Sequence, residues 1–376
     1  MRILVTDGHY KNALGIVRAL GREHEVWVTA PRRLAMAGVS RFAHRLLIGP
    51  PPSEAQFVTW LDRVVRRHRF ELIIPVGARA CEALSRTADR WGPGTAVVIA
   101  PPEAMARALD KRQAMQLAAE VGLAVPRTAE PRSIDDAERA AQEVGHPLVV
   151  KAPMEGTTGV GYVDHPGQTT AAVRAWQQRH GLGTDVMPIL QQRIVGRGYG
   201  VFATYQDGRC VRLAAHRRVR EFPPEGGEST CCELEHDPDV LAAGRRLLDA
   251  LGWHGVAMVE LKRHDADGRL YLMEVNPKFW GSLDLMLAAG ADFPGDLVRI
   301  ARGERLEPVP PPTGELRFCW PLGNDLRHLL ARPGAWRTIL GDWFGGARTN
   351  LRAGDPLPHL VELAGTLARA ALGRRA

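Results

Sequence analysis

The chain has 376 residues, of which 45% are hydrophobic and 24% charged, a globular composition with enough length for two or three domains. Its net charge is +7, but the arginines are scattered along the chain, so we expect anionic small-molecule ligands and no nucleic-acid partner. Only five residues are lysines (Lys11, Lys111, Lys151, Lys262, Lys278). Five cysteines without a CxxC pair, no signal-like start and no apolar run near the ~20 residues of a transmembrane segment favour a cytoplasmic protein.

The first hundred residues predict alternating strands and helices. Residues 3–6, 25–29 and 72–76 are apolar and strand-like, and residues 12–20 form an amphipathic helix that ends at Gly21. The first turn, Asp7 to Lys11, lacks the GxGxxG fingerprint of a dinucleotide site. We therefore predict a Rossmann-like domain over residues 1–105 that does not bind NAD.

The next segment, residues 106–188, predicts a linker helix and a small lid subdomain. One helix is expected over residues 103–121, with Lys111 in its middle, and a short apolar strand ends in Lys151. A run of glycine and threonine follows, whose backbone N–H groups could close over phosphates, although a plain surface loop would look the same (Glu155, Gly156, Thr157, Thr158, Gly159). A lysine that ends an apolar strand is costly to bury unless an anion receives it, which favours the phosphate site.

A sheet domain is predicted over residues 189–305, beginning with a strand that carries Gln191 and Gln192. A hairpin about Asp207-Gly208 leads into HRRVREFPPEGGEST, residues 216–230. Its arginines could hold an oxyanion or carboxylate in bidentate fashion, or could form a solvated basic strand end. Arg218, Arg220 and Glu228 together suggest a zwitterionic ligand such as an amino acid.

Residues 256–262 and 269–275 predict a β-hairpin around a polar turn. If the turn is centred on Asp267, Glu260 lies opposite Glu274, and Asn276 follows on the same face. Facing carboxylates repel unless a cation lies between them, and Mg²⁺ takes such oxygen ligands together with phosphate oxygens and water. Spacing alone leaves open the alternative of two solvated glutamates.

Residues 306–376 predict a helical C-terminal extension after a proline-rich linker. Its last helix, expected over residues 358–372, places Leu360, Leu363, Leu367 and Ala371 along one side, which we expect to pack against the body of the protein. A peripheral membrane contact through its basic end is the alternative.

Taken in order, these parts resemble the ATP-grasp superfamily, in its carbamoyl-phosphate-synthase-like branch. The stretch MEVNPKFWGS, residues 273–282, is similar to the metal-binding signature of the superfamily, and HRRVREFPPEGGEST is similar to the corresponding segment of the branch. The resemblance covers about residues 1–304. It implies an α/β fold with a Rossmann-like N-terminal domain, a small central lid and an ATP-grasp sheet domain, followed here by the helical tail.

The resemblance also implies roles for single residues. Mg²⁺, with Mn²⁺ as an alternative, would be held between the phosphates of ATP by Glu260, Glu274 and Asn276. Lys111 and Lys151 would contact the phosphates, with Glu155 to Gly159 as a lid. Adenine would meet Gln191, Gln192 and the backbone near Ile194. Lys278, where the family commonly has arginine, would stabilise the transferring phosphoryl group, and Arg218 and Arg220 would hold carboxylate or acyl-phosphate oxygens.

Two positions depart from the family pattern. Gln191 and Tyr199 stand where acidic residues often contact the nucleotide, which puts the affinity for ATP and the choice of base in doubt. The function implied is an ADP-forming ligase that activates a carboxylate as an acyl phosphate and couples it to an amine. An ATP-binding scaffold or sensor and a small-molecule kinase are the other hypotheses. The substrates would be amino-acid-like acids and amines, and a homodimer is one assembly left open.

Overall fold

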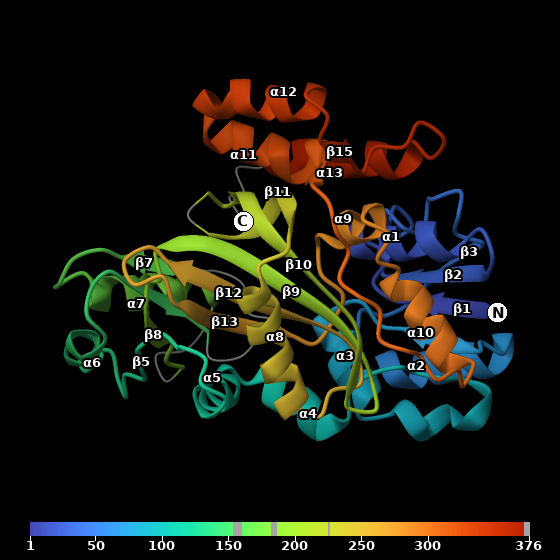
Figure 1. The fold of residues 1–376 in the computed structure, drawn as a ribbon, viewed down its shortest axis with the longest axis horizontal. Helices are drawn as coiled ribbons and strands as arrows, with labels where there is room; N and C mark the ends of the chain where they lie inside the picture. The colour runs from blue at the N-terminus through green and yellow to red at the C-terminus, as the bar shows by residue number, and fades with distance from the viewer. Residues whose placement is uncertain (153–159, 182–185, 225, 372–376) are drawn as a thin grey trace. The chain divides into compact units, whose positions relative to one another are not determined.

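The computed structural model describes residues 1–152, 160–181, 186–224 and 226–371 (Figure 1). The chain divides into two compact units, which we describe separately. The first unit comprises residues 1–106, 199–258 and those from 276 onward. The second comprises residues 107–198 and 259–275.

The first unit begins with a four-stranded parallel sheet in the order β3-β2-β1-β4. Its elements are β1 (Arg2–Val5), α1 (Lys11–Leu20), β2 (Glu25–Ala30), β3 (Arg45–Ile48), α2 (Phe57–His68), β4 (Leu72–Ile74) and α3 (Ala78–Ser85). Side chains alternate across β1, so Ile3 and Val5 pack in one core with α1, whereas Leu4 packs in another with α2 and α3. The predicted alternation of strands and helices in this part of the chain is confirmed (Figure 1).

A second sheet of this unit contains β9, β10, β11, β14 and β15 as successive neighbours. The bounds are β9 (Gly196–Gln206), β10 (Arg209–Phe222), β11 (Glu228–Glu235), β14 (Arg317–Cys319) and β15 (Arg348–Thr349). Asp207 and Gly208 have φ of 50° and 77°, which forms the tight hairpin turn that their sequence predicts. Because β14 and β15 join this sheet, the C-terminal extension is not purely helical.

The helices of the first unit beyond residue 230 flank these strands or belong to the C-terminal extension. They are α8 (Pro238–Ala250), α9 (Leu283–Ala288), α10 (Phe293–Ala301), α11 (Leu326–Ala331), α12 (Trp336–Phe344) and α13 (Leu357–Ala371). Short helical turns lie at Ala88–Gly94, Pro321–Asp325 and Pro333–Ala335.

The second unit contains an antiparallel sheet in the order β5-β8-β6-β7. Its elements are β5 (Thr128–Ala129), α6 (Ala137–Val144), β6 (Leu148–Lys151), β7 (Gly161–Val163), α7 (Thr169–His180) and β8 (Ile189–Gln192). Leu148 and Val150 share a buried core with α6 and α7. Lys151 alternates with Val150, so it points to the face of the sheet away from these helices.

The predicted carboxylate hairpin is confirmed as two neighbouring strands, β12 (Gly255–His264) and β13 (Leu270–Asn276). The division between the units falls within both strands: residues 259–275 belong to the second unit, whereas residues 255–258 of β12 and Asn276 of β13 belong to the first. Asp265 N–H donates to the carbonyl oxygen of Val195 at 3.0 Å, which ties the turn to the segment after β8.

The single helix predicted over residues 103–121 was wrong. The structure has α4 (Pro102–Leu109) and α5 (Lys111–Glu120), separated by Asp110. The Asp110 side chain accepts hydrogen bonds from the backbone N–H groups of Arg112 and Gln113, as an N-cap residue does. Lys111 is therefore the first residue of α5, not the middle of a longer helix.

The prediction that the leucine side of α13 packs against the body of the protein was also wrong. Leu360 and Leu367 are 60% and 54% exposed, whereas His359, Glu362 and Thr366 are buried. The reason is Arg18, a buried cation of α1, which pairs with Asp355 at 2.8 Å and lies 3.0 Å from Nε2 of His359. A buried charge needs polar partners, so the polar side of α13 faces inward.

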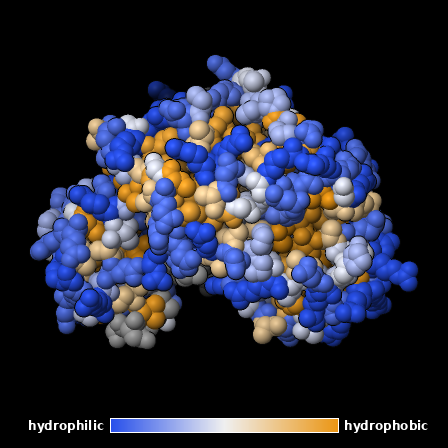
Figure 2. All heavy atoms as spheres, turned by 60° about the horizontal axis from the view of Figure 1, so that its bottom comes forward, coloured by the Kyte–Doolittle hydropathy of each residue, from blue (hydrophilic) through white to orange (hydrophobic). Residues whose placement is uncertain are grey.

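One face of the molecule is hydrophilic over most of its area, with hydrophobic side chains gathered in patches (Figure 2). Among the described residues, no helix combines the length and the hydrophobicity that crossing a bilayer would require.

Candidate functional site

Two lysines and a glutamate meet in the second unit. Lys111 begins α5, and its Nζ lies 4.0 Å from Oε2 of Glu274 on β13. The same Nζ donates to the carbonyl oxygen of Ala152 at 3.4 Å, directly after Lys151. The N-cap at Asp110 thus places the ammonium group of Lys111 where the ends of β6 and β13 approach each other.

The surroundings of Lys151 lower the pKa of its ammonium group. Burial, and after it the charge of Lys111, lower the pKa of Lys151 from 10.5 to about 8, although Glu274 and Glu260 act in the opposite direction. Protonated Lys151 is therefore destabilised in two ways, by repulsion from Lys111 and by the loss of its hydration. An anionic ligand would relieve both costs.

Glu260 and Glu274 are half-buried, and both act electrostatically on Lys151. Asn276 ends β13 two residues after Glu274, so the two side chains point to the same face of that strand. Lys278 donates from Nζ to Oδ1 of Asn276 at 2.7 Å. Two carboxylates and an amide oxygen are the hard ligands that Mg²⁺ prefers, so the residues fit the predicted ion. The direct opposition of Glu260 and Glu274 stays a prediction.

The adenine residues divide between the two faces of the small sheet. Gln191 pairs with Val149 and Gln192 with Leu148, so only Gln191 points to the side of Lys151. Gln191 is buried and donates to Oγ1 of Thr128 at 2.9 Å. The two glutamine side chains therefore point to opposite faces of the sheet, and Oε1 of Gln192 accepts from the N–H of Arg127 at 3.3 Å. A contact of Gln192 with adenine stays a prediction.

Lys262 is a residue of this site that sequence reasoning missed. It follows Glu260 by two positions on β12, and its Nζ donates to the carbonyl oxygen of Ile194 at 3.5 Å. Its charge also contributes to the lowered pKa of Lys151. Two signals could have found it, the scarcity of lysine in the chain and the same-face spacing from Glu260.

Arg218 and Arg220, two of the three arginines in residues 216–230, have different partners, and both lie in the first unit. Arg218 donates to Oε1 of Glu221 at 2.7 Å and to the carbonyl oxygen of Gly227 at 3.1 Å. Arg220 is buried and donates to both carboxylate oxygens of Asp325, at 3.1 and 3.0 Å, and to Asp342. The expectation that Arg220 holds a substrate is therefore corrected, because two carboxylates of the C-terminal extension already bind its guanidinium.

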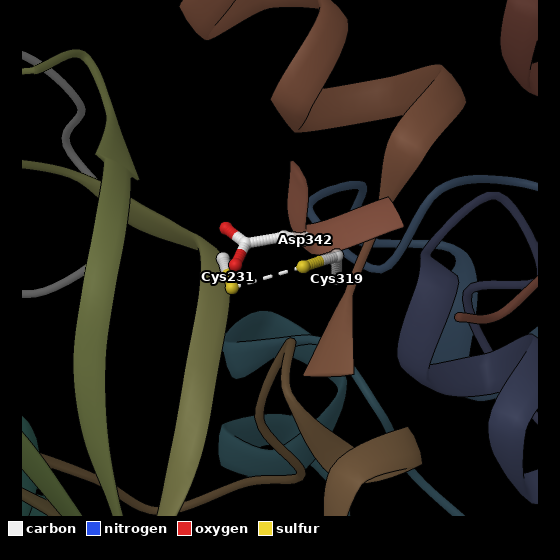
Figure 3. A group of neighbouring side chains, drawn as sticks. All are labelled: Cys231, Cys319 and Asp342. Atoms are coloured by element: carbon white, nitrogen blue, oxygen red, sulfur yellow. Dashed lines mark hydrogen bonds between the residues drawn. The ribbon is translucent and has the colours of Figure 1, made fainter. Parts of the chain in front are cut away.

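Cys231, Cys319 and Asp342 lie close enough together to be considered as a metal site, the one such group of His, Cys, Asp and Glu among the described residues (Figure 3). The two Sγ atoms are 2.9 Å apart on the paired strands β11 and β14. However, Asp342 accepts hydrogen bonds from Arg220 and Arg317, and the neighbouring thiol and burial raise the pKa of Cys231. Arginines already neutralise this cluster, so we assign no metal to it.

The predicted lid residues Glu155, Gly156, Thr157, Thr158 and Gly159 lie outside the described residues.

Comparison with known proteins gives concordant results. Residues 186–320 match a family model described as "ATP-grasp in the biosynthetic pathway with Ter operon". A D-alanine–D-alanine ligase of Stutzerimonas stutzeri is 32% identical over 50% of this chain and 63% of its own length. The N-terminal section of the carbamoyl phosphate synthase large chain of Methanopyrus kandleri is 26% identical over 55% of this chain and 38% of its own length.

The chain thus spans less than two thirds of either curated relative. Among solved structures, the biotin carboxylase–βγ-ATP complex of Campylobacter jejuni superposes with a TM-score of 0.66 at 16% identity, over 81% of this chain and 71% of that one. At this identity the likeness concerns the fold, and it agrees with the fold expected from the sequence.

Proposed function

We propose that this chain is a ligase of the ATP-grasp superfamily, which is supported by the family model and by the relatives reported above. The reaction would join a carboxylate to an amine and convert ATP into ADP and phosphate. One observation carries the proposal: Lys111 and Lys151 gather with Glu260 and Glu274 within one compact unit. Lysine is a compact point charge suited to phosphates, and carboxylates hold the divalent cation that accompanies them.

We assign the polyphosphate of ATP to Lys111 and Lys151, whose mutual repulsion an anion would relieve. Glu260, Glu274 and Asn276 would hold Mg²⁺, which when bound neutralises charge on the phosphoryl oxygens; Mn²⁺ accepts the same ligands and is proposed as a substitute. Adenine is assigned to the surroundings of Gln191 and the backbone near Ile194.

Lys278 and Arg218 are assigned to the acid substrate. Lys278 donates to Oδ1 of Asn276, so its ammonium lies beside a proposed metal ligand, where charge develops during phosphoryl transfer. Arg218 would hold the carboxylate or acyl-phosphate oxygens.

The chemistry takes two balanced steps. A carboxylate oxygen attacks the terminal phosphorus of ATP, the bond to ADP breaks, and an acyl phosphate forms. The amine then attacks the acyl carbon, the C–O bond to phosphate breaks, and an amide, phosphate and a proton result. The residues named here supply positioning and charge neutralisation, which are the main requirements of phosphoryl transfer.

The test is turnover of the purified chain with ATP, Mg²⁺ and all pairs of the proteinogenic amino acids. We expect ADP, phosphate and an amide in equal amounts, and Glu274→Ala should lower the rate at least ~100-fold because a metal ligand is lost. Glu143→Ala, on the exposed face of α6, is the matched control and should leave the rate unchanged. Release of AMP and pyrophosphate would contradict the proposal, and a stable phosphorylated product without an amide would indicate a kinase.

We also propose a cytoplasmic location, which is supported by the five cysteines, all free thiols and all buried. The homodimer stays a prediction, which light scattering of the purified chain would measure.

A further inference from the structure

Lys11 has no role in the function proposed above, yet several parts of the first unit hold its side chain in place. It is the first residue of α1, directly after the turn that follows β1. Its Nζ lies 3.4 Å from Oε2 of Glu228 and 5.0 Å from the centroid of the Trp320 ring, and the side chain is only 14% exposed. A Cβ added at Gly281 would lie 2.7 Å from Cε of Lys11, so the end of the lysine side chain passes close to this glycine.

Glu228, its partner, is an accessible carboxylate that is nevertheless fixed. It is the first residue of β11, directly after the Gly226-Gly227 turn, and its side chain is 74% exposed. Asn324 donates to its Oε2 at 3.3 Å. The charge of Lys11 is the main reason why the pKa of Glu228 is lowered. Glu228 therefore remains ionised, oriented and open to solvent.

The pair lies beside residues that the ligase reaction uses, all within the first unit. Asn12, next to Lys11, donates to the carbonyl oxygen of Phe279 at 2.9 Å, which fixes the start of α1 against the loop that contains Lys278. The charges of Lys278 and Glu228 both influence Tyr10, the residue before Lys11. On the other side, Arg218 donates to the carbonyl oxygen of Gly227, adjacent to Glu228.

A cation and an anion held a few ångströms apart at a solvent-accessible position can each exchange its partner for a ligand of opposite charge. Glu228 is the exposed member of the pair, so its carboxylate can turn toward a ligand in the solvent, and a ligand carboxylate can then take its place beside the largely buried Lys11. A ligand that carries both an ammonium and a carboxylate would replace both halves of the pair at once. A ligand with only one of these charges would leave Lys11 or Glu228 without compensation.

We infer that Lys11 and Glu228 bind the amine substrate and select a zwitterion, with Glu228 receiving its ammonium group and Lys11 its carboxylate. The inference rests on the proposed ligase function and deepens it, because it names the class of the nucleophile as a free amino acid. The plain alternative is that the ion pair only fastens α1 to β11.

Binding without ATP tests this inference separately from turnover. The twenty proteinogenic amino acids are screened by calorimetry against the full chain, and the tightest one is compared with its α-amide, which lacks the carboxylate, and its N-acetyl derivative, which lacks the ammonium. We expect at least tenfold weaker binding of both derivatives. Lys11→Met should abolish the preference over the amide alone, and Glu228→Gln the preference over the N-acetyl derivative alone.

The matched control is Glu307→Gln, an 81% exposed carboxylate of the same unit, which should keep both preferences. Binding of no free amino acid, equal binding of the amide, or preferences that survive both substitutions would overturn the inference, and Glu228→Gln decides alone if Lys11→Met does not fold. An amino acid that binds as expected but supports no ADP release would instead contradict the proposed ligase function.

Discussion

The lysine–glutamate site of the second unit and the Arg220 cluster of the first unit both combine basic residues with carboxylates, but their charges are balanced differently. Lys151 has a pKa lowered to about 8 by burial and by Lys111. Arg220 has a raised pKa, because Asp325 and Asp342 bind its guanidinium and outweigh the effect of burial. Uncompensated charge marks a place for a ligand, whereas saturated charge marks a structural contact.

The largest loss of stability is expected when Arg220 is replaced, and a small loss would break this comparison. Arg220→Ala leaves Asp325 and Asp342 buried without their shared cation, and the loss of one partner of a buried ion pair typically costs about 3–5 kcal/mol. Urea unfolding measures the change, with Arg79→Ala, from an exposed pair on α3, as the control that should cost at most ~1 kcal/mol. A similar small cost for both would show that Arg220 is not structural.

Lys151→Met should lower activity without lowering stability, in contrast to Arg220→Ala. It removes a cation assigned to the phosphates, so kcat/KM for ATP should fall about 10²–10³-fold, while the free energy of unfolding should not decrease because a costly buried charge disappears. Steady-state kinetics and urea unfolding of the same preparation measure both quantities. Loss of stability with unchanged kinetics would assign Lys151 to the fold instead.

The pH dependence should be the most gradual effect. Above pH 8 Lys151 loses its proton in the ligand-free protein, so KM for ATP should rise, by up to about tenfold per pH unit. Stability should change with the other sign: between about pH 8 and 10.5 the unfolded chain binds more protons at this lysine than the folded chain, so this group makes stability rise with pH. In Lys151→Met both contributions should vanish, and a wild-type KM that is flat from pH 7 to 9.5 would contradict the assignment.

Local patterns were sufficient for much of the fold and for part of the site. The strand that ends in Lys151 and the carboxylate hairpin follow from short-range alternation and turn residues, and both are confirmed. The break before Lys111 was visible in principle, since Asp110 is a good helix N-cap, but an unbroken helical pattern across it concealed the break.

Long-range partners account for what the sequence did not reveal. The partners of Arg220 lie 105 and 122 residues away, and no local spacing announces them. The same holds for α13, whose buried side is chosen by Arg18 rather than by its leucines. The exposed Leu360 and Leu367 show that hydrophobic periodicity is a weaker guide where a distant buried charge must be satisfied.

The pairing of β14 with β11 also bears on how the chain can be shortened. Cys231, Cys232 and Glu233 of β11 lie opposite Cys319, Phe318 and Arg317, so a truncation after the proline-rich linker would leave β11 with a bare row of N–H and C=O groups. Such an edge invites pairing between copies and aggregation. The C-terminal extension thus covers the edge of the sheet, and a version of the chain that ends near residue 304 would lose β14, whereas one that ends at residue 320 would keep it.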